Sequence, residues 1–202
     1  MRFSFRICAT ALVLFGLCAA PVAAEIAGSP GTPPAAASAD PDDPTAMSPP
    51  EELELKPRTV VFASGKGKWD DSEDMFNSAF KAIYLAIARQ NLHSAGPPMV
   101  EYLESDDSHF SFKAMVPVDQ PSEAAAGPDL GPDVQMGEGP TGKVLKFVHR
   151  GSFDTLEQVY NRIDDYLASK DLTMARVVEE YVTDQRLTPD NEMVTNIYVF
   201  TK

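Results

Sequence analysis

Hydrophobic and polar positions repeat one plan twice along most of this chain. Residues 58–118 and 143–202 each contain an alternating stretch, then an apolar stripe at helical spacing, then two more alternating stretches. Alternation with period two is typical of strands, and recurrence every three or four residues is typical of an amphipathic helix. Each segment therefore predicts one strand, one helix and two further strands, which together form a βαββ module.

The first module is expected to open with a strand over residues 59–62 and to continue through a glycine-containing loop over residues 64–71. Asp71 or Ser72 is a suitable N-cap for the helix that follows. A hairpin over residues 99–104 and 110–118 completes the module. The helix would bury one apolar stripe, formed by Phe76, Ala79, Phe80, Ile83 and Ile87.

The second module follows the same order. Residues 143–149 alternate as a strand, Gly151 ends it, and a helix is expected to start near Asp154 or Thr155. Residues 176–182 and 193–201 predict the last hairpin. The apolar stripe of this helix consists of Leu156, Val159, Tyr160, Ile163 and Leu167.

A duplicated module folds as one domain because each half has a sheet face that only its partner can cover. The predicted fold class is α+β, with antiparallel sheets, helices packed on one side, pseudo-twofold symmetry and a central cleft. Residues 119–142, rich in proline, glycine and acids, are interpreted as a mobile connector between module one, 58–118, and module two, 143–202.

The N-terminal part predicts export. Residues 1–24 place Arg2 and Arg6 before an apolar run that ends in small residues, which is the layout of a cleaved signal peptide. Residues 25–57 are rich in proline, alanine and serine and are expected to form a disordered tether. The predicted location is therefore periplasmic or secreted, with no stable membrane insertion after cleavage.

Charge and cysteine content exclude several classes of function. The formal net charge is −13, and loss of the signal peptide would make it −15, which argues against nucleic acid as a partner. Cys8 and Cys18 both lie in the signal peptide, so the mature chain would have neither a disulfide nor a thiolate metal site. No metal or cofactor is expected. His149, at the end of a strand, is expected to have a structural role by bonding a neighbouring backbone group.

Several strings resemble the GyrI-like small-molecule-binding domain, which also serves as the effector-binding domain of bacterial transcription regulators. They are residues 149–153 (HRGSF), the helix at 156–167, residues 179–184 (EEYVTD), and Thr188-Pro189 followed by residues 195–198. The resemblance extends over residues 58–202 and is looser in the first module. It implies two βαββ modules around a cleft that binds flat or cationic hydrophobic molecules through aromatic side chains and a buried acid.

Strand parity suggests which side chains line that cleft. Side chains alternate across a strand, and the purely aliphatic sides suit packing against the helix. Glu179 and Tyr181 of one strand, with Asn196 and Tyr198 of the next, are then left to face the cleft. The resemblance implies that Glu179 is the pocket glutamate, which would pair with a cation or polar proton of the ligand. The alternative is an ordinary surface acid.

Three further residues qualify this site. Asn196 stands where many relatives of the family have a second glutamate, which weakens the expectation of strong selectivity for cations. Lys113, at the equivalent place in module one, is expected to be able to neutralise Glu179 across the cleft. Trp69, in the first loop, is either an aromatic lid over a ligand or a packing plug.

The leading interpretation is an exported domain that binds a small amphipathic or aromatic molecule. One alternative is a hydrolase of small electrophilic compounds that uses Glu179 with Tyr181 or Tyr198 to position water and protonate a leaving group. Another is a protein-interaction module whose partner is unknown. The sequence favours binding over catalysis because it contains no serine, cysteine or metal constellation typical of an enzyme.

Overall fold

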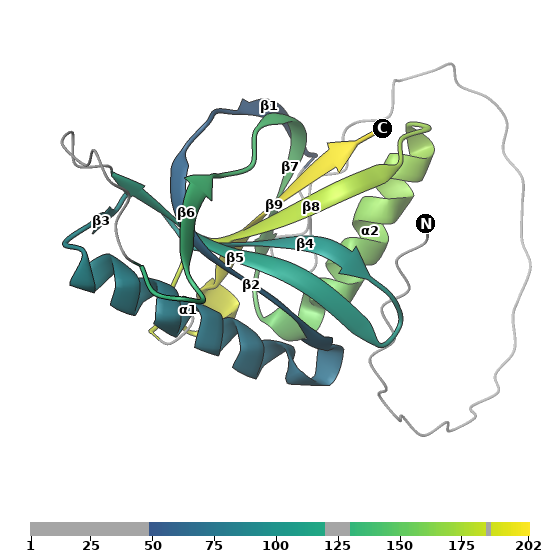
Figure 1. Cartoon of the computed structure of the whole chain (residues 1–202). Coiled ribbons are helices and arrows are strands. Elements are labelled where there is room, and N and C mark those ends of the chain that lie inside the picture. Colours follow the sequence, from purple (N-terminus) through teal and green to yellow (C-terminus); the bar gives the residue numbers. More distant parts are fainter. Residues whose placement is uncertain (1–48, 120–129, 185–186) are drawn as a thin grey trace, which may run out of the picture.

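The computed structural model describes residues 49–119, 130–184 and 187–202. The predicted signal peptide and the tether up to residue 48 lie outside these ranges. The described part contains two long helices and nine strands in one antiparallel sheet (Figure 1). The elements are β1 Glu51–Leu55, β2 Thr59–Lys68, α1 Ser72–Arg89, β3 His93–Ser94, β4 Met99–Ser105, β5 His109–Asp119, β6 Gln135–Glu138, β7 Gly142–Arg150, α2 Leu156–Ser169, β8 Met174–Tyr181 and β9 Val194–Thr201.

The two predicted βαββ modules are confirmed. Module one consists of β2, α1, β4 and β5, and module two consists of β7, α2, β8 and β9. The strand order is β1-β7-β9-β8-β4-β5-β2-β6, with β3 added beside β5, so the modules meet at the antiparallel pair of β4 and β8. The α+β fold with pseudo-twofold symmetry is as predicted.

The centre of the symmetry lies at the β4–β8 pair, where Val100 is directly opposite Glu179. Tyr102 lies two residues after Val100 on β4, and Tyr181 lies two residues after Glu179 on β8. Each of these tyrosines lies beside an aromatic side chain from the turn that precedes its own module's helix. The ring centroids of Trp69 and Tyr102 are 5.9 Å apart, and those of Phe153 and Tyr181 are 5.8 Å apart.

Two strands appear where none was predicted. Residues 51–55, assigned to the disordered tether, form β1, and residues 135–138 of the connector form β6. Both extend the sheet at its edges: β1, from the segment before module one, pairs with β7 of module two, and β6, from the connector, pairs with β2 of module one. The alternation of Leu53 and Leu55 with acids explains β1, because both leucines pack against buried residues of the sheet.

Short links draw the two ends of this sheet together. Residues 56–58 join β1 to β2, and residues 139–141 join β6 to β7, each with a proline in the middle. Leu55 pairs with Gly142 on one side of the links and Thr59 pairs with Glu138 on the other. Between them the Gly139 N–H donates to the Arg58 carbonyl at 2.8 Å. A three-residue link spans at most about 14 Å, so the sheet must curl.

The loop predicted at residues 64–71 is shorter than expected, because β2 continues to Lys68. The glycines that suggested a loop instead leave space for large side chains on the strand. A Cβ atom at Gly65 would lie 2.6 Å from the ring of Phe112, and one at Gly67 would collide with Met75. These glycines therefore allow close packing within a strand.

Both long helices cover the same face of the sheet, called here the helix face. Under α1, Ile83 and Ala86 pack with residues of β2 and β5, and under α2, Val159 and Ile163 pack with residues of β7 and β9. The opposite face has its own small core of Val60, Met99, Met115, Val144, Val178 and Tyr198. In the described part of the chain, no helix is long and apolar enough to span a membrane.

Candidate functional site

A buried carboxylate, that of Glu179, lies at the centre of the helix face. Glu179 on β8 is 2 % exposed and accepts hydrogen bonds from three tyrosine hydroxyls. The Tyr160 hydroxyl donates to Oε1 at 2.6 Å, and those of Tyr181 and Tyr102 donate to Oε2 at 2.9 and 3.2 Å. These four residues are called the Glu179 cluster. They combine one buried acid with three aromatic rings, of which those of Tyr160 and Tyr181 are buried and that of Tyr102 is half-buried.

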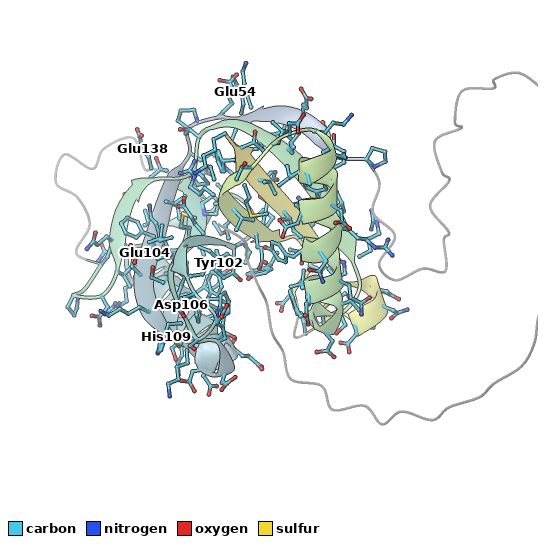
Figure 2. The ribbon with its side chains drawn as sticks, turned by 90° about the vertical axis from the view of Figure 1, so that its right-hand side faces the viewer. Glu54, Tyr102, Glu104, Asp106, His109 and Glu138 are labelled. Carbon is cyan, nitrogen blue, oxygen red and sulfur yellow. The ribbon has the colours of Figure 1, made fainter. Side chains whose placement is uncertain are left out.

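Three elements from both modules build this cluster. Tyr181 lies two residues after Glu179 on β8, so strand parity directs both to the same face. Tyr160 lies on the buried face of α2. Tyr102 comes from β4 of the other module and lies between the β4–β5 hairpin and α2 (Figure 2). The site therefore exists only when the two modules are joined.

Burial and hydrogen bonding act against each other on the acid. Removal from water raises the pKa of Glu179 above its ordinary value, and the three hydroxyl donors lower it by a smaller amount. Burial and the charge of Glu179 hold the pKa values of Tyr102, Tyr160 and Tyr181 well above that of free tyrosine. The tyrosines therefore stay protonated at neutral pH and act as donors to the acid.

Trp69 borders the cluster and is held in place by its own contacts. Its ring stacks on Phe110 with centroids 4.4 Å apart, and its indole N–H donates to the Asp106 carbonyl at 2.9 Å. These contacts are those of a packing plug at the β4–β5 turn. Trp69 also lies beside Tyr102, with ring centroids 5.9 Å apart. Direct contact with a ligand remains a prediction.

The prediction that Glu179, Tyr181, Asn196 and Tyr198 share one face is wrong. In the β8–β9 ladder Glu179 is opposite Ile197, whereas Glu180 is opposite Asn196. Residues directly opposite each other point to the same side of a sheet. Glu179 and Tyr181 therefore belong to the helix face, and Asn196 and Tyr198 belong to the opposite face.

Asn196 and Tyr198 instead form hydrogen bonds with a second buried acid, Glu180. The Asn196 amide and the Tyr198 hydroxyl each donate to Glu180 Oε2 at 2.7 Å. Arg58 Nη2 lies 3.5 Å from the other carboxylate oxygen. Burial raises the pKa of the Tyr198 hydroxyl, and the neighbouring Glu180 raises it further. Among the described residues no buried side-chain nitrogen or oxygen lacks a hydrogen-bond partner, so this group has the arrangement of a structural network.

Lys113 is also on the opposite face, so it cannot neutralise Glu179. Its ammonium lies 4.1 Å from the centroid of the Phe62 ring, and it donates to the Glu138 carbonyl at 3.5 Å. Among the residues that the structure describes, no ion pair includes Glu179. Within the described ranges, the charge of the buried acid is stabilised by hydroxyl dipoles and by no cationic side chain.

Two residues of the cluster were missed at the sequence level. Tyr102 follows Glu101 as Tyr181 follows Glu180, so the internal repeat itself was a signal for its position. Tyr160 was assigned to the apolar stripe of its helix, which is correct for its ring, but its hydroxyl reaches the acid. The expected structural role of His149 is confirmed. Its Nε2 lies 3.1 Å from the Ser152 carbonyl, in the turn that begins α2.

Metal ligands do not gather in this site. Within residues 49–119, 130–184 and 187–202, no three histidine, cysteine, aspartate or glutamate side chains are placed to hold a metal ion. The side chains of the Glu179 cluster themselves supply a carboxylate, hydroxyl groups and aromatic rings.

The family model of the GyrI-like small molecule binding domain matches residues 48–201. The chain belongs to this family. The resemblance seen in the strings around Gly151 and Glu179 is thereby confirmed, and the match includes β1, which had been assigned to the tether. No curated protein sequence matches the chain at a significant level.

Solved structures share the fold at low sequence identity. The EcmrR C-terminal domain has a TM-score of 0.61 at 12% identity, and the alignment covers 76% of this chain and 96% of that one. An uncharacterized conserved protein from Listeria innocua has a TM-score of 0.56 at 16% identity, covering 76% and 92%. SAV2435 bound to tetraphenylphosphonium has a TM-score of 0.52 at 15% identity, covering 76% and 93%.

Proposed function

We propose that this protein binds a small amphipathic or aromatic molecule at the Glu179 cluster, and that it does so after export to the periplasm or the medium. The observation that carries the proposal is the buried Glu179 carboxylate, which has three hydroxyl donors and, among the residues that the structure describes, no cationic side chain paired with it. A desolvated acid of this kind favours a ligand that brings a cation or a polar proton. The membership in a family of small-molecule-binding domains supports the same function.

Ligand binding would require one hydroxyl to leave the acid. Tyr102 is the best candidate, because its bond to Glu179 is the longest of the three and its side chain is only half-buried. A bulge between Tyr102 and Glu104 interrupts the β4–β5 ladder beside it. When the ring of Tyr102 turns aside, a flat group of the ligand can occupy the space that it vacates. The neighbouring rings of Phe76 and Trp69 offer stacking surfaces to that group.

The test uses tetraphenylphosphonium, the ligand of the structural neighbour SAV2435, and the uncharged triphenylphosphine oxide as its matched analogue. We expect the cation to raise the melting temperature and to change Trp69 fluorescence, with a weaker response to the neutral compound. Glu179→Gln should remove the preference for the cation. No response to either compound at millimolar concentration would contradict the proposal.

Export is tested separately. Cell fractionation should place the protein in the periplasm or the medium, and the mass of the purified protein should correspond to a chain that begins near Glu25. A cytoplasmic protein that retains Met1 would refute export, and would leave binding at Glu179 unaffected.

Binding fits the geometry better than hydrolysis. The hydrolase alternative used Glu179 with Tyr181 or Tyr198, but Tyr198 lies on the opposite face with Glu180. The Tyr181 hydroxyl donates a hydrogen bond to Glu179 and has a strongly raised pKa, which makes it a poor acid for a leaving group. The cluster is therefore suited to hold a polar group of a ligand.

A further inference from the structure

A concave site lies outside the Glu179 cluster and shares no residue with it. A groove of about 400 Å³ separates α1 from the chain segment that leads into β6. Figure 1 shows this segment passing along α1 before the strand turns away. The volume is within the range of small-molecule sites, roughly 300–1,000 Å³.

The groove exists because the segment is anchored at two points and bows outward between them. Leu130 and Val134 are buried against the core, at 5 % and 6 % exposure. Gly131 has a φ of +93°, a conformation that side chains rarely adopt, and it turns the chain away from the helix. Pro132 and Asp133 are exposed at the outer rim.

The helix supplies an apolar wall to the groove. Ala82, Leu85 and Arg89 lie three and four residues apart, so they share one side of α1. Leu85 is 55 % exposed, which leaves its side chain available to an apolar ligand. The floor is formed by Leu130 and Val134, so both wall and floor are aliphatic.

One end of the groove has a guanidinium group. Arg89 Nη2 donates to the Leu130 carbonyl at 3.3 Å, which holds the side chain along the groove and leaves its other N–H donors unused by described residues. Asp133 also lines the groove, yet no ion pair joins it to Arg89 in the described part of the chain. A fixed guanidinium beside an aliphatic wall complements a carboxylate with an apolar body.

We propose that this groove binds small carboxylic acids with an apolar chain or ring, with the carboxylate on Arg89 and the apolar part against Leu85, Leu130 and Val134. Asp133 opposes such a ligand by charge repulsion and so limits its affinity. The site is independent of the Glu179 cluster and of the function proposed for it.

The probe is octanoate, titrated into the full chain and followed by amide chemical shifts in NMR, with octylamine as the cationic analogue. We expect octanoate to shift the amides of Leu85, Gly131 and Val134. Arg89→Gln should weaken binding about tenfold or more, because a charge-assisted hydrogen bond is lost. Asp133→Asn should leave binding equal or tighter.

Matched variants locate the site. Leu85→Ser should weaken octanoate binding, whereas Leu103→Ser, at a similarly exposed leucine on β4, should not. Glu179→Gln should have no effect on octanoate. Binding that survives Arg89→Gln, equal affinity for octylamine in the groove, or shifts confined to the Glu179 cluster would overturn the proposal, and none of these results bears on binding of the phosphonium cation at Glu179.

Discussion

Val100 and Glu179 lie directly opposite each other where the two modules meet, so the pseudo-twofold axis relates an apolar side chain to a buried acid. The two helices show the same difference, an apolar side chain in module one and a polar one at the equivalent position in module two. Phe76 follows Trp69 by seven residues, as Tyr160 follows Phe153, but only Tyr160 has a hydroxyl to donate to the acid. The symmetry of the backbone is thus broken by the side chains. If a ligand binds at the Glu179 cluster as we propose, its polar end is expected to face module two and its apolar body to face module one.

The first prediction concerns pH. Burial raises the pKa of Glu179 in the folded protein, so the folded state binds this proton more tightly than the unfolded state does. Its contribution to stability is then fully present below the unfolded pKa, near 4.3, and is lost as pH rises through the folded pKa. Wild type should lose free energy of unfolding relative to Glu179→Gln over this window, by up to about 1.4 kcal/mol per pH unit.

Urea unfolding of both proteins at several pH values between 4 and 8 measures this difference. The comparison with Glu179→Gln cancels the titration of the other acids, because the glutamine keeps the shape of the protonated side chain. A difference that stays constant over the whole range would show that Glu179 has the same pKa in the folded and unfolded states.

The second prediction concerns Tyr160. Tyr160→Phe removes the shortest of the three hydrogen bonds to Glu179 and keeps the ring that packs in the core. The loss of one donor to a buried charge should lower the free energy of unfolding by about 1–3 kcal/mol at pH 7. The loss should shrink at pH 4, where the acid is protonated.

Tyr166→Phe is the control for Tyr160→Phe. Tyr166 lies on the same helix and its ring packs edge-on against Phe147, so the variant also removes one hydroxyl and keeps the ring. It is expected to change stability by less than about 0.5 kcal/mol. Equal losses for the two variants would mean that the hydroxyl bond to Glu179 contributes nothing specific.

The third prediction concerns β1. A chain shortened to begin at residue 58 loses the β1–β7 ladder and the packing of Leu53 and Leu55 against the opposite-face core. Both leucines are only half-buried, so the expected loss is about 2 kcal/mol of unfolding free energy relative to a chain that begins at residue 49. Thermal and urea unfolding of the two chains measure it, and equal stability would show that β1 adds nothing to the fold.

Much of the fold was readable from the sequence because it depends on local periodicity. The stripe from Phe76 to Ile87 predicted α1, and the alternation of residues 143–149 predicted β7. The edge strands were missed because their alternation is short and is surrounded by proline, glycine and acids. Local composition in residues 51–55 and 135–138 favours loops, and only pairing with the other module overrides it.

The site was only partly readable for a related reason. Parity within one strand is fixed by its sequence, so the pairing of Glu179 with Tyr181 was correct. The match between two strands depends on their register across the turn, and both faces of β8 contain a glutamate, so polarity gave no guidance. The side of β9 with Ile197 was correctly assigned to the helix face. The side of β8 that pairs with it, which includes Glu179, was wrongly assigned to the other face.

The last prediction tests that register. Asn196→Asp replaces the amide that donates to Glu180 at 2.7 Å with a second carboxylate on the opposite face. A lost donor and a like charge at a buried acid should lower the free energy of unfolding by about 2–4 kcal/mol at pH 7, with recovery at acid pH as one carboxyl takes up a proton. Because Glu179 points to the other side of the sheet, binding of tetraphenylphosphonium measured on the folded variant should stay within about twofold of wild type. If Asn196→Asp instead strengthens binding of the cation tenfold while leaving stability unchanged, Asn196 faces the ligand and the assignment of the two faces is wrong.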